Sequence, residues 1–144
     1  MKKNKKMRIA VDVNCWISSL LSLEFRIRLD VIFGSEYHLI ASEKLFYELE
    51  NAIRKPYLAE RIARAAYEKL VSKLWTVAEL VDVHSVVDVC RDPKDNYLLA
   101  LAKDGNADYL ITGDDDLCVL KQFGKTKIVK WNEFEALLQE MKNH

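Results

Sequence analysis

Short apolar runs alternate with longer amphipathic stretches along the whole chain, which is the pattern of parallel strands connected by helices. The predicted strands are residues 7–12, 37–40, 79–83, 108–112 and 127–129. Each apolar run is short and nearly uninterrupted, as expected for strands that are buried on both faces. The alternation predicts an α/β fold with three layers, in which helices cover both faces of a parallel sheet.

Helical spacing of apolar residues fills the segments between these strands. The predicted helices are residues 16–21, 24–33, 42–54, 58–75, 92–103, 114–122 and a last helix that begins at Asn132. Ser42 is a suitable N-cap for the third of these, and Asp92 followed by Pro93 is a typical helix start. For the last helix, Asn132 is predicted as the cap, with Glu135 as its capping-box partner.

The composition is that of an ordinary globular domain of 144 residues, with 50% hydrophobic and 31% charged residues. We predict one domain, residues 7–144, preceded by a basic tail, residues 1–6. No apolar run reaches the 18 or so residues of a membrane span, and Asp12 interrupts the first one. We therefore expect a cytoplasmic protein that does not associate with a membrane.

Charge and cysteine content exclude several classes of site. Lys plus Arg and Asp plus Glu number 22 each, so the formal net charge is zero, which argues against a long nonspecific footprint on duplex nucleic acid. A short single-stranded target remains compatible with this balance. The three cysteines have no C-x-x-C spacing and the three histidines are scattered, so neither a zinc site nor a disulfide framework is indicated.

Four acids follow the strands in turn. Asp12 ends the first strand, Glu48 lies in the helix after the second, Asp95 begins the helix after the third, and Asp114 follows the fourth. Such positions build the ligand site of an open parallel sheet. Converging carboxylates repel each other by about 4 kcal/mol per close pair at intermediate dielectric, and a divalent cation such as Mg²⁺ offsets this repulsion. The pattern favours a metal-dependent enzyme that acts on phosphates.

Three of the four acids also have a simpler explanation. Asp95 and Asp114 suit helix N-termini, where they would interact with the helix dipole. Glu48 is compatible with a solvated helix position. Only Asp12 resists such an explanation, because an acid at the end of a buried strand needs a partner.

Several motifs in their order resemble the PIN-domain ribonucleases. They are Asp12-Val13-Asn14, Glu48-Leu49, Arg91-Asp92-Pro93-Lys94-Asp95-Asn96 and Thr112-Gly113-Asp114-Asp115-Asp116-Leu117. The resemblance extends from Met7 to the final helix and is greatest to the VapC-like branch, the toxin components of toxin–antitoxin pairs. It implies a five-stranded parallel sheet in the order 3-2-1-4-5, with the acids meeting at the carboxyl edge.

The resemblance also implies roles for individual residues. The implied catalytic residues and metal ligands are Asp12, Glu48, Asp95 and Asp114, with Asp116 as a possible fifth metal ligand. The implied cofactor is Mg²⁺ or Mn²⁺. Supporting polar places fall to Asn14, Ser18 and Thr112. Candidate bases for the RNA phosphates are Arg26, Arg54, Lys55, Arg91 and Lys94. Candidate aromatic residues for base stacking, which core packing explains equally well, are Trp16, Tyr47 and Tyr97.

One position departs from the family pattern. The first motif commonly reads Asp-Thr-Asn in the family, whereas Val13 stands in the middle here. Valine keeps the branched shape and lacks the hydroxyl, so a supporting hydrogen bond is in question while the metal ligands are not.

The expected function is hydrolysis of phosphodiester bonds in single-stranded or structured RNA, as the toxin of a pair with a separate antitoxin protein. The resemblance also implies a possible homodimer through the small-residue face of the helix at 58–75, although ordinary core packing explains the same face equally well. An alternative keeps the fold and loses the activity, as in a binding or scaffold protein, and metal binding would separate the two.

A receiver or phosphatase-like domain is a further alternative, since an acid ending the first strand occurs there too. The phosphatase pattern requires a second Asp where this chain has Asn14, and Asp88 and Thr112 imitate only parts of a receiver. That interpretation leaves Glu48 and Asp95 unexplained.

Overall fold

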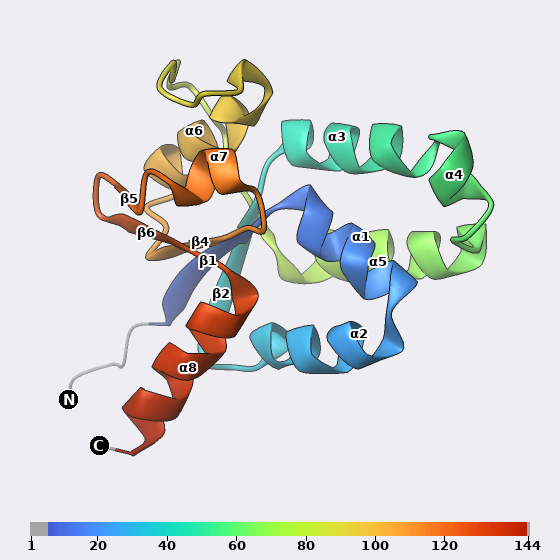
Figure 1. Cartoon of the computed structure of the whole chain (residues 1–144), viewed down its shortest axis with the longest axis horizontal. Helices are drawn as coiled ribbons and strands as arrows, with labels where there is room; N and C mark the ends of the chain where they lie inside the picture. The colour runs from blue at the N-terminus through green and yellow to red at the C-terminus, as the bar shows by residue number, and fades with distance from the viewer. Residues whose placement is uncertain (1–5, 144) are drawn as a thin grey trace.

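A computed structural model describes residues 6–143 of the chain and leaves residues 1–5 and 144 undescribed. The centre of the fold is a six-stranded sheet in the order β3-β2-β1-β4-β6-β5, with helices on both sides (Figure 1). The five parallel strands are β1 (Met7–Val11), β2 (Tyr37–Ala41), β3 (Glu79–Leu80), β4 (Tyr109–Ile111) and β6 (Thr126–Val129). The predicted parallel sheet and its order are confirmed. The expected basic tail, except Lys6, lies outside the described residues.

Two details of the sheet differ from the prediction. A two-residue strand, β5 (Gln122–Phe123), pairs antiparallel with β6 at the edge, in a segment predicted to be helical. Strand β3 ends at Leu80, three residues earlier than predicted. Central strands β1 and β4 are the most deeply buried, since Ile9, Leu110 and Ile111 are fully inaccessible to solvent. Apolar side chains on both faces explain why these strands lie in the middle.

The helices are joined by short connections. They are α1 (Val13–Leu21), α2 (Leu23–Leu29), α3 (Glu43–Ile53), α4 (Pro56–Ala59), α5 (Arg64–Val77), α6 (Asn96–Asp104), α7 (Asp115–Cys118) and α8 (Trp131–Lys142), with 3-10 turns η1 (Asp30–Phe33) and η2 (Pro93–Asp95). The predicted cap of α3 is confirmed, because Ser42 Oγ accepts a hydrogen bond from the Leu45 amide at 3.2 Å. Within residues 6–143, no helix has the length and apolar character of a membrane span.

The single helix predicted at 58–75 is wrong, because the chain breaks between α4 and α5. A continuous helix would bury Ile62 and Ala66 on one face. Instead Ile62 is buried, Ala66 is exposed and Tyr67 is buried. The break therefore moves the buried face by one residue and brings the Tyr67 ring into the core.

The predicted start of the last helix is also wrong. Helix α8 begins one residue before Asn132, and its N-cap is Lys130, whose amide donates to Glu133 Oε1 at 2.9 Å. The earlier start buries Trp131 against Phe134, with ring centroids 5.6 Å apart. Glu135, the predicted capping partner, forms an ion pair with Arg28 instead.

Candidate functional site

The register of β1 against β4 builds the centre of the site. Val11 lies opposite Ile111, so the next residues, Asp12 and Thr112, meet at the carboxyl edge of the sheet. Thr112 Oγ1 donates to Asp12 Oδ2 at 2.6 Å and accepts from the Asp114 amide at 3.0 Å. One buried hydroxyl thus links two of the predicted acids across the two central strands.

Asp12 is nearly inaccessible to solvent, with 4% of its surface exposed. Burial raises the pKa of its carboxyl, and the nearby charge of Asp114 adds to this, while hydrogen bonds from Thr112 and the Asn14 amide act in the opposite direction. The dominant cause is desolvation, which disfavours the charged form. A nearby cation would instead favour the charged form of this carboxyl.

Asp95 lies at the end of η2, immediately before α6. Its Oδ2 atom is buried and has no hydrogen-bond partner among the described residues. Burial and then the adjacent Asp114 raise the pKa of Asp95 to about 7, with smaller contributions from the charges of Asp12 and Asp92. A buried carboxylate oxygen without a partner is costly unless a ligand satisfies it.

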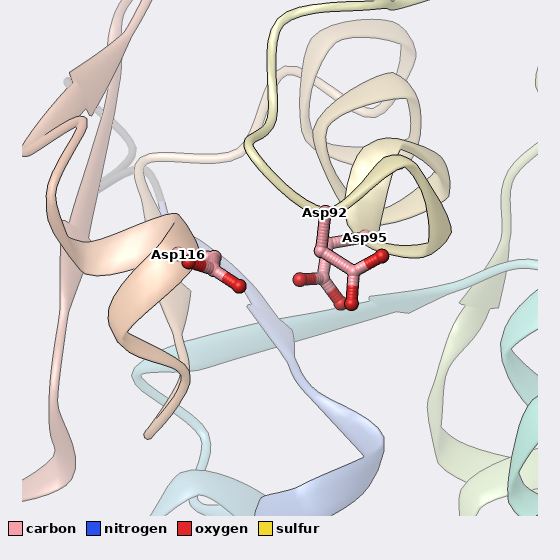
Figure 2. A group of neighbouring side chains, drawn as sticks. All are labelled: Asp92, Asp95 and Asp116. Carbon is pink, nitrogen blue, oxygen red and sulfur yellow. The ribbon is translucent and has the colours of Figure 1, made fainter.

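Carboxylates from two separate elements converge beside it. Oxygen atoms of Asp92, Asp95 and Asp116 lie within 4.8 Å of one another. Figure 2 shows Asp116 reaching from α7 toward Asp92 and Asp95, which come from the η2 region. Asp114 caps α7, since its Oδ1 accepts from the Asp116 amide at 2.9 Å.

Glu48 lies on α3, and its charge acts on the Tyr97 hydroxyl together with those of two other acids. Burial raises the pKa of that hydroxyl, and the charges of Asp12, Glu48 and Asp95 raise it further. Glu48 Oε1 also pairs with Lys44 Nζ at 3.0 Å, one helical turn earlier. Of the four acids predicted from the sequence, Asp12, Asp95 and Asp114 act directly on one another's carboxyl groups, while Glu48 acts with Asp12 and Asp95 on the Tyr97 hydroxyl.

The predicted supporting residues differ in position. Thr112 is buried within the acid network, as described. Asn14 is exposed, and its backbone amide donates to Asp12 Oδ1 at 3.4 Å. Ser18 is exposed one turn further along α1. Of the three, Thr112 makes the most extensive contacts with the acids.

Two of the five predicted bases lie close to the acids. Arg91 Nε pairs with Asp116 Oδ1 at 2.9 Å, and Lys94 is exposed on η2 itself. Arg26 instead lines a groove of about 480 Å³ between α1, α2 and α5. Arg54 pairs with Glu50 at 3.7 Å at the end of α3, and Lys55 precedes α4.

The three candidate stacking residues are also separated. Trp16 is 3% exposed and belongs to the core, so it is not available to a base. Tyr47 is 59% exposed on α3, with Lys44 Nζ 5.0 Å from its ring centroid. Tyr97 is half-buried in the first turn of α6, and the charges of Asp12, Glu48 and Asp95 act on its hydroxyl.

Asp92 is the residue that the sequence analysis missed as a candidate ligand. It was predicted only as a helix cap, and it does cap η2, because its Oδ1 accepts from the Lys94 amide at 3.1 Å. Its position three residues before Asp95 was the available signal, since residues three apart in a helical turn lie on one side. Capping and proximity to the acid cluster are compatible in this geometry.

These residues fit a divalent metal ion. The donors are carboxylate oxygens, and the cluster of Asp92, Asp95 and Asp116 includes neither cysteine nor histidine. Oxygen donors of this kind suit Mg²⁺ and Mn²⁺. The unpartnered oxygen of Asp95 is the place where such an ion would satisfy an otherwise unmet polar group.

Comparison with known proteins agrees with this geometry. A family described as PIN domain matches residues 8–116, so the chain belongs to the PIN-domain family. Members of this family are typically metal-dependent nucleases, and the acidic cluster is consistent with the divalent metal site of such enzymes. The fold, the cluster and the family match therefore support one another.

Two individual proteins are similar over most of the chain. The uncharacterized protein MJ1680 of Methanocaldococcus jannaschii is 27% identical over 124 residues, which is 83% of this chain and 79% of that protein. The crystal structure of PAE2754 from Pyrobaculum aerophilum covers 99% of this chain and 100% of its own, with a TM-score of 0.59 and 18% identity. The second similarity supports the fold.

Proposed function

We propose that this protein is a Mg²⁺- or Mn²⁺-dependent endoribonuclease that hydrolyses phosphodiester bonds of single-stranded RNA. The observation that carries the proposal is the buried, unpartnered Oδ2 of Asp95 inside a group of converging carboxylates. The family supports nuclease chemistry in general. RNA as the substrate is proposed from the resemblance of the sequence motifs to PIN-domain ribonucleases.

In the proposed site, the metal is held by Asp12, Glu48, Asp95 and Asp114, with Asp92 and Asp116 at its margin. When bound, the metal lowers the pKa of a water molecule and neutralises charge that develops on the phosphate. Neighbouring polar groups hydrogen-bond to these acids and fix their positions, as is common around metal ligands.

Chain residues outside the acid group have supporting roles in this proposal. Thr112 holds Asp12 and the start of α7 in fixed relation through its hydroxyl. Arg91 and Lys94 supply positive charge where the RNA backbone would enter. Arg91 already neutralises Asp116, which keeps that carboxylate beside the cluster.

The direct test is cleavage of a fluorogenic single-stranded RNA in Mn²⁺ or Mg²⁺. We expect the parent to cleave and cleavage to be lost with EDTA or in Asp95→Asn. A matched control is Asp88→Asn, which neutralises an exposed acid on the segment between β3 and η2 and should retain activity. Cleavage that persists in both EDTA and Asp95→Asn would come from a contaminant.

Metal binding separates the proposal from the inactive scaffold. The parent could fail to cleave this RNA while Mn²⁺ raises the melting temperature of the parent and not that of Asp95→Asn. In that case the metal site is intact and the enzyme requires a different RNA substrate. If neither cleavage nor metal stabilisation occurs, the nuclease proposal is wrong and the inactive scaffold is favoured.

We propose further, on the motif resemblance, that the nuclease is the toxin of a toxin–antitoxin pair and forms a homodimer. Induced expression of the parent should arrest growth of a bacterial host, whereas Asp95→Asn should not. The small residue Ala66 is exposed on α5, so Ala66→Glu should reduce dimer formation in sedimentation experiments. Growth unaffected by soluble, active parent would contradict the toxin role.

A further inference from the structure

A basic cleft lies at the edge of the sheet opposite the acids. It has a volume of about 880 Å³. Its charged lining contains one acid, Asp108, and five basic residues: Lys6, Arg8, His38, Lys125 and Lys127. These residues lie at or beside the amino ends of β1, β2, β4 and β6, whose registers align Arg8 with His38 and Tyr109 with Lys127. The acids follow the carboxyl ends, about 15 Å away along a five-residue strand.

Part of the positive charge in the cleft is already compensated. Both terminal nitrogens of Arg8 bond Glu79 at 3.2 Å, and its Nε donates to the Gly105 carbonyl at 2.7 Å. His38 Nε2 lies 2.8 Å from the same Glu79 carboxylate. The guanidinium of Arg8 is therefore fixed as part of the wall of the cleft.

The acid in the cleft, Asp108, is also engaged by neighbouring groups. Asp108 Oδ2 accepts from the Arg8 amide at 2.8 Å, and its Oδ1 lies 3.4 Å from Lys125 Nζ. Lys6 and Lys127 form no ion pair among the described residues. Their ammonium groups leave an excess of positive charge that faces solvent.

Charge is distributed unevenly over the molecule, and this favours binding of a polyanion at the basic cleft. The formal net charge is zero, while acids concentrate at the carboxyl edge. A polyanion would be repelled by that edge and attracted to the amino edge, because local potential steers association even in a neutral molecule.

We propose that the basic cleft binds the phosphodiester backbone of single-stranded RNA at a place separate from the acidic site. Lysine ammonium groups bind phosphate as point charges and do not read bases, so the cleft would attract and hold the strand without selecting its sequence. The proposal rests on the proposed function, because the strand held here is taken to be the substrate. Only a few phosphates would be contacted, which agrees with the zero net charge.

The test is fluorescence anisotropy of a short labelled single-stranded RNA in EDTA, at several salt concentrations. In the double variant Lys6→Gln with Lys127→Gln, we expect affinity at low salt to fall roughly tenfold. The slope of log affinity against log salt should become shallower by about 1.4, since each single-strand phosphate contact contributes about 0.7.

Two controls separate the cleft from the acids and from overall charge. Arg61→Gln with Lys69→Gln removes the same charge from the α4–α5 region, which lies away from β6 in Figure 1, and should retain parent affinity. Asp95→Asn should bind RNA at least as well as the parent in EDTA. Parent affinity in the cleft variant, or equal losses in both double variants, would overturn the proposal.

The outcome is independent of the nuclease proposal, because EDTA prevents metal-dependent cleavage. A parent that binds RNA through the cleft but neither cleaves RNA nor is stabilised by Mn²⁺ would contradict the nuclease and leave the cleft supported. A parent that cleaves, with binding unchanged in Lys6→Gln with Lys127→Gln, would support the nuclease and overturn the cleft.

Discussion

At the scale of single residues, the hydroxyl of Thr112 has the largest structural role in the acid group. It is fully buried, donates to Asp12 and accepts from the amide that begins α7. Val13, which lacks the hydroxyl usual at its position, is buried in the core. The hydrogen bond to the Asp12 carboxylate comes from the Thr112 hydroxyl, which follows the neighbouring strand β4. Asp12 therefore keeps a hydroxyl donor although Val13 has none.

Substitution Thr112→Val keeps the side-chain shape and removes both hydrogen bonds. We expect the stability to fall by about 1–3 kcal/mol, because two polar partners are left unsatisfied. Metal affinity should fall roughly 10- to 100-fold, because Asp12 is no longer oriented. Denaturant titration and calorimetry with Mn²⁺ measure the two effects.

Thr126→Val is the matched control. Thr126 is also buried, and its hydroxyl donates to the Ala107 carbonyl at 2.7 Å, at the other edge of the sheet. It should lower stability by a similar amount and leave metal affinity unchanged. If both variants lost metal affinity equally, the special role of Thr112 would be refuted.

The raised pKa of Asp95 predicts how metal-free protein responds to pH. Its folded pKa of about 7 exceeds the ordinary value of 3.8, so the folded state binds the proton more tightly. The contribution of Asp95 to the free energy of unfolding should therefore fall as pH rises from about 4 to 7. In EDTA at pH 8, Asp95→Asn should be more stable than the parent, by on the order of 1 kcal/mol after solvent screening.

Denaturant titrations of parent and variant across this pH range check the prediction. The difference in unfolding free energy between the two proteins should become small near pH 4, where the carboxyl is protonated in the unfolded state as well. The exposed-site control Asp88→Asn should follow the parent at every pH. A parent whose stability rises between pH 4 and 7 relative to Asp95→Asn would contradict a raised pKa.

At the scale of elements, the segment between β3 and η2 is held by two side chains of α6, Asp104 and Asn96. Asp104 accepts hydrogen bonds from the His84 and Ser85 amides, at 2.6 and 2.8 Å, and from the Ser85 hydroxyl. These bonds lower the pKa of Asp104 to about 2. Further along, the Asn96 side chain accepts from the Cys90 amide at 3.0 Å. Both contacts hold the segment that leads to Asp92.

Substitution Asp104→Ala should therefore loosen this segment while the sheet remains intact. We expect hydrogen exchange at the His84 and Ser85 amides to accelerate roughly tenfold or more, since their acceptor is lost. Exchange in β1 and β4 should not change. Asp108→Ala provides a comparison acid whose hydrogen bond and ion pair go to Arg8 and Lys125 instead. Unchanged exchange at His84 and Ser85 in Asp104→Ala would show that Asp104 does not hold the segment.

At the scale of the whole molecule, acids at one edge of the sheet face away from bases at the other. A divalent ion that binds only the folded state stabilises it by mass action. With Mn²⁺ at about 100 times its dissociation constant, the parent should gain about 2.7 kcal/mol, or about 5–10 °C in melting temperature. Scanning calorimetry with and without EDTA measures this shift.

The same ion should leave Asp95→Asn nearly unchanged, while Asp88→Asn should behave as the parent. An equal shift in all three proteins would indicate that Mn²⁺ binds elsewhere. The comparison therefore assigns the stabilisation to the acid group and not to surface carboxylates in general.

Local patterns were sufficient for much of the fold and failed where tertiary packing competed with them. The parallel strands and the cap at Ser42 follow from apolar runs and short-range hydrogen bonding, whereas the strand order was implied by the family resemblance. The break between α4 and α5 carried no stop signal, because burial of Tyr67 decides it. The early start of α8 likewise follows from burial of Trp131, which outweighs the capping preference of Asn132.

The sequence by itself determined which acids follow which strands, because apolar periodicity and strand ends are local properties of the chain. Only the tertiary structure decided that Asp92 joins Asp95 and Asp116, and that Arg91 neutralises Asp116. Side-chain direction and the register of distant strands set those contacts. The basic cleft was also decided by the tertiary structure, since Lys6 and Lys127 line one cleft only because parallel strands align their amino ends.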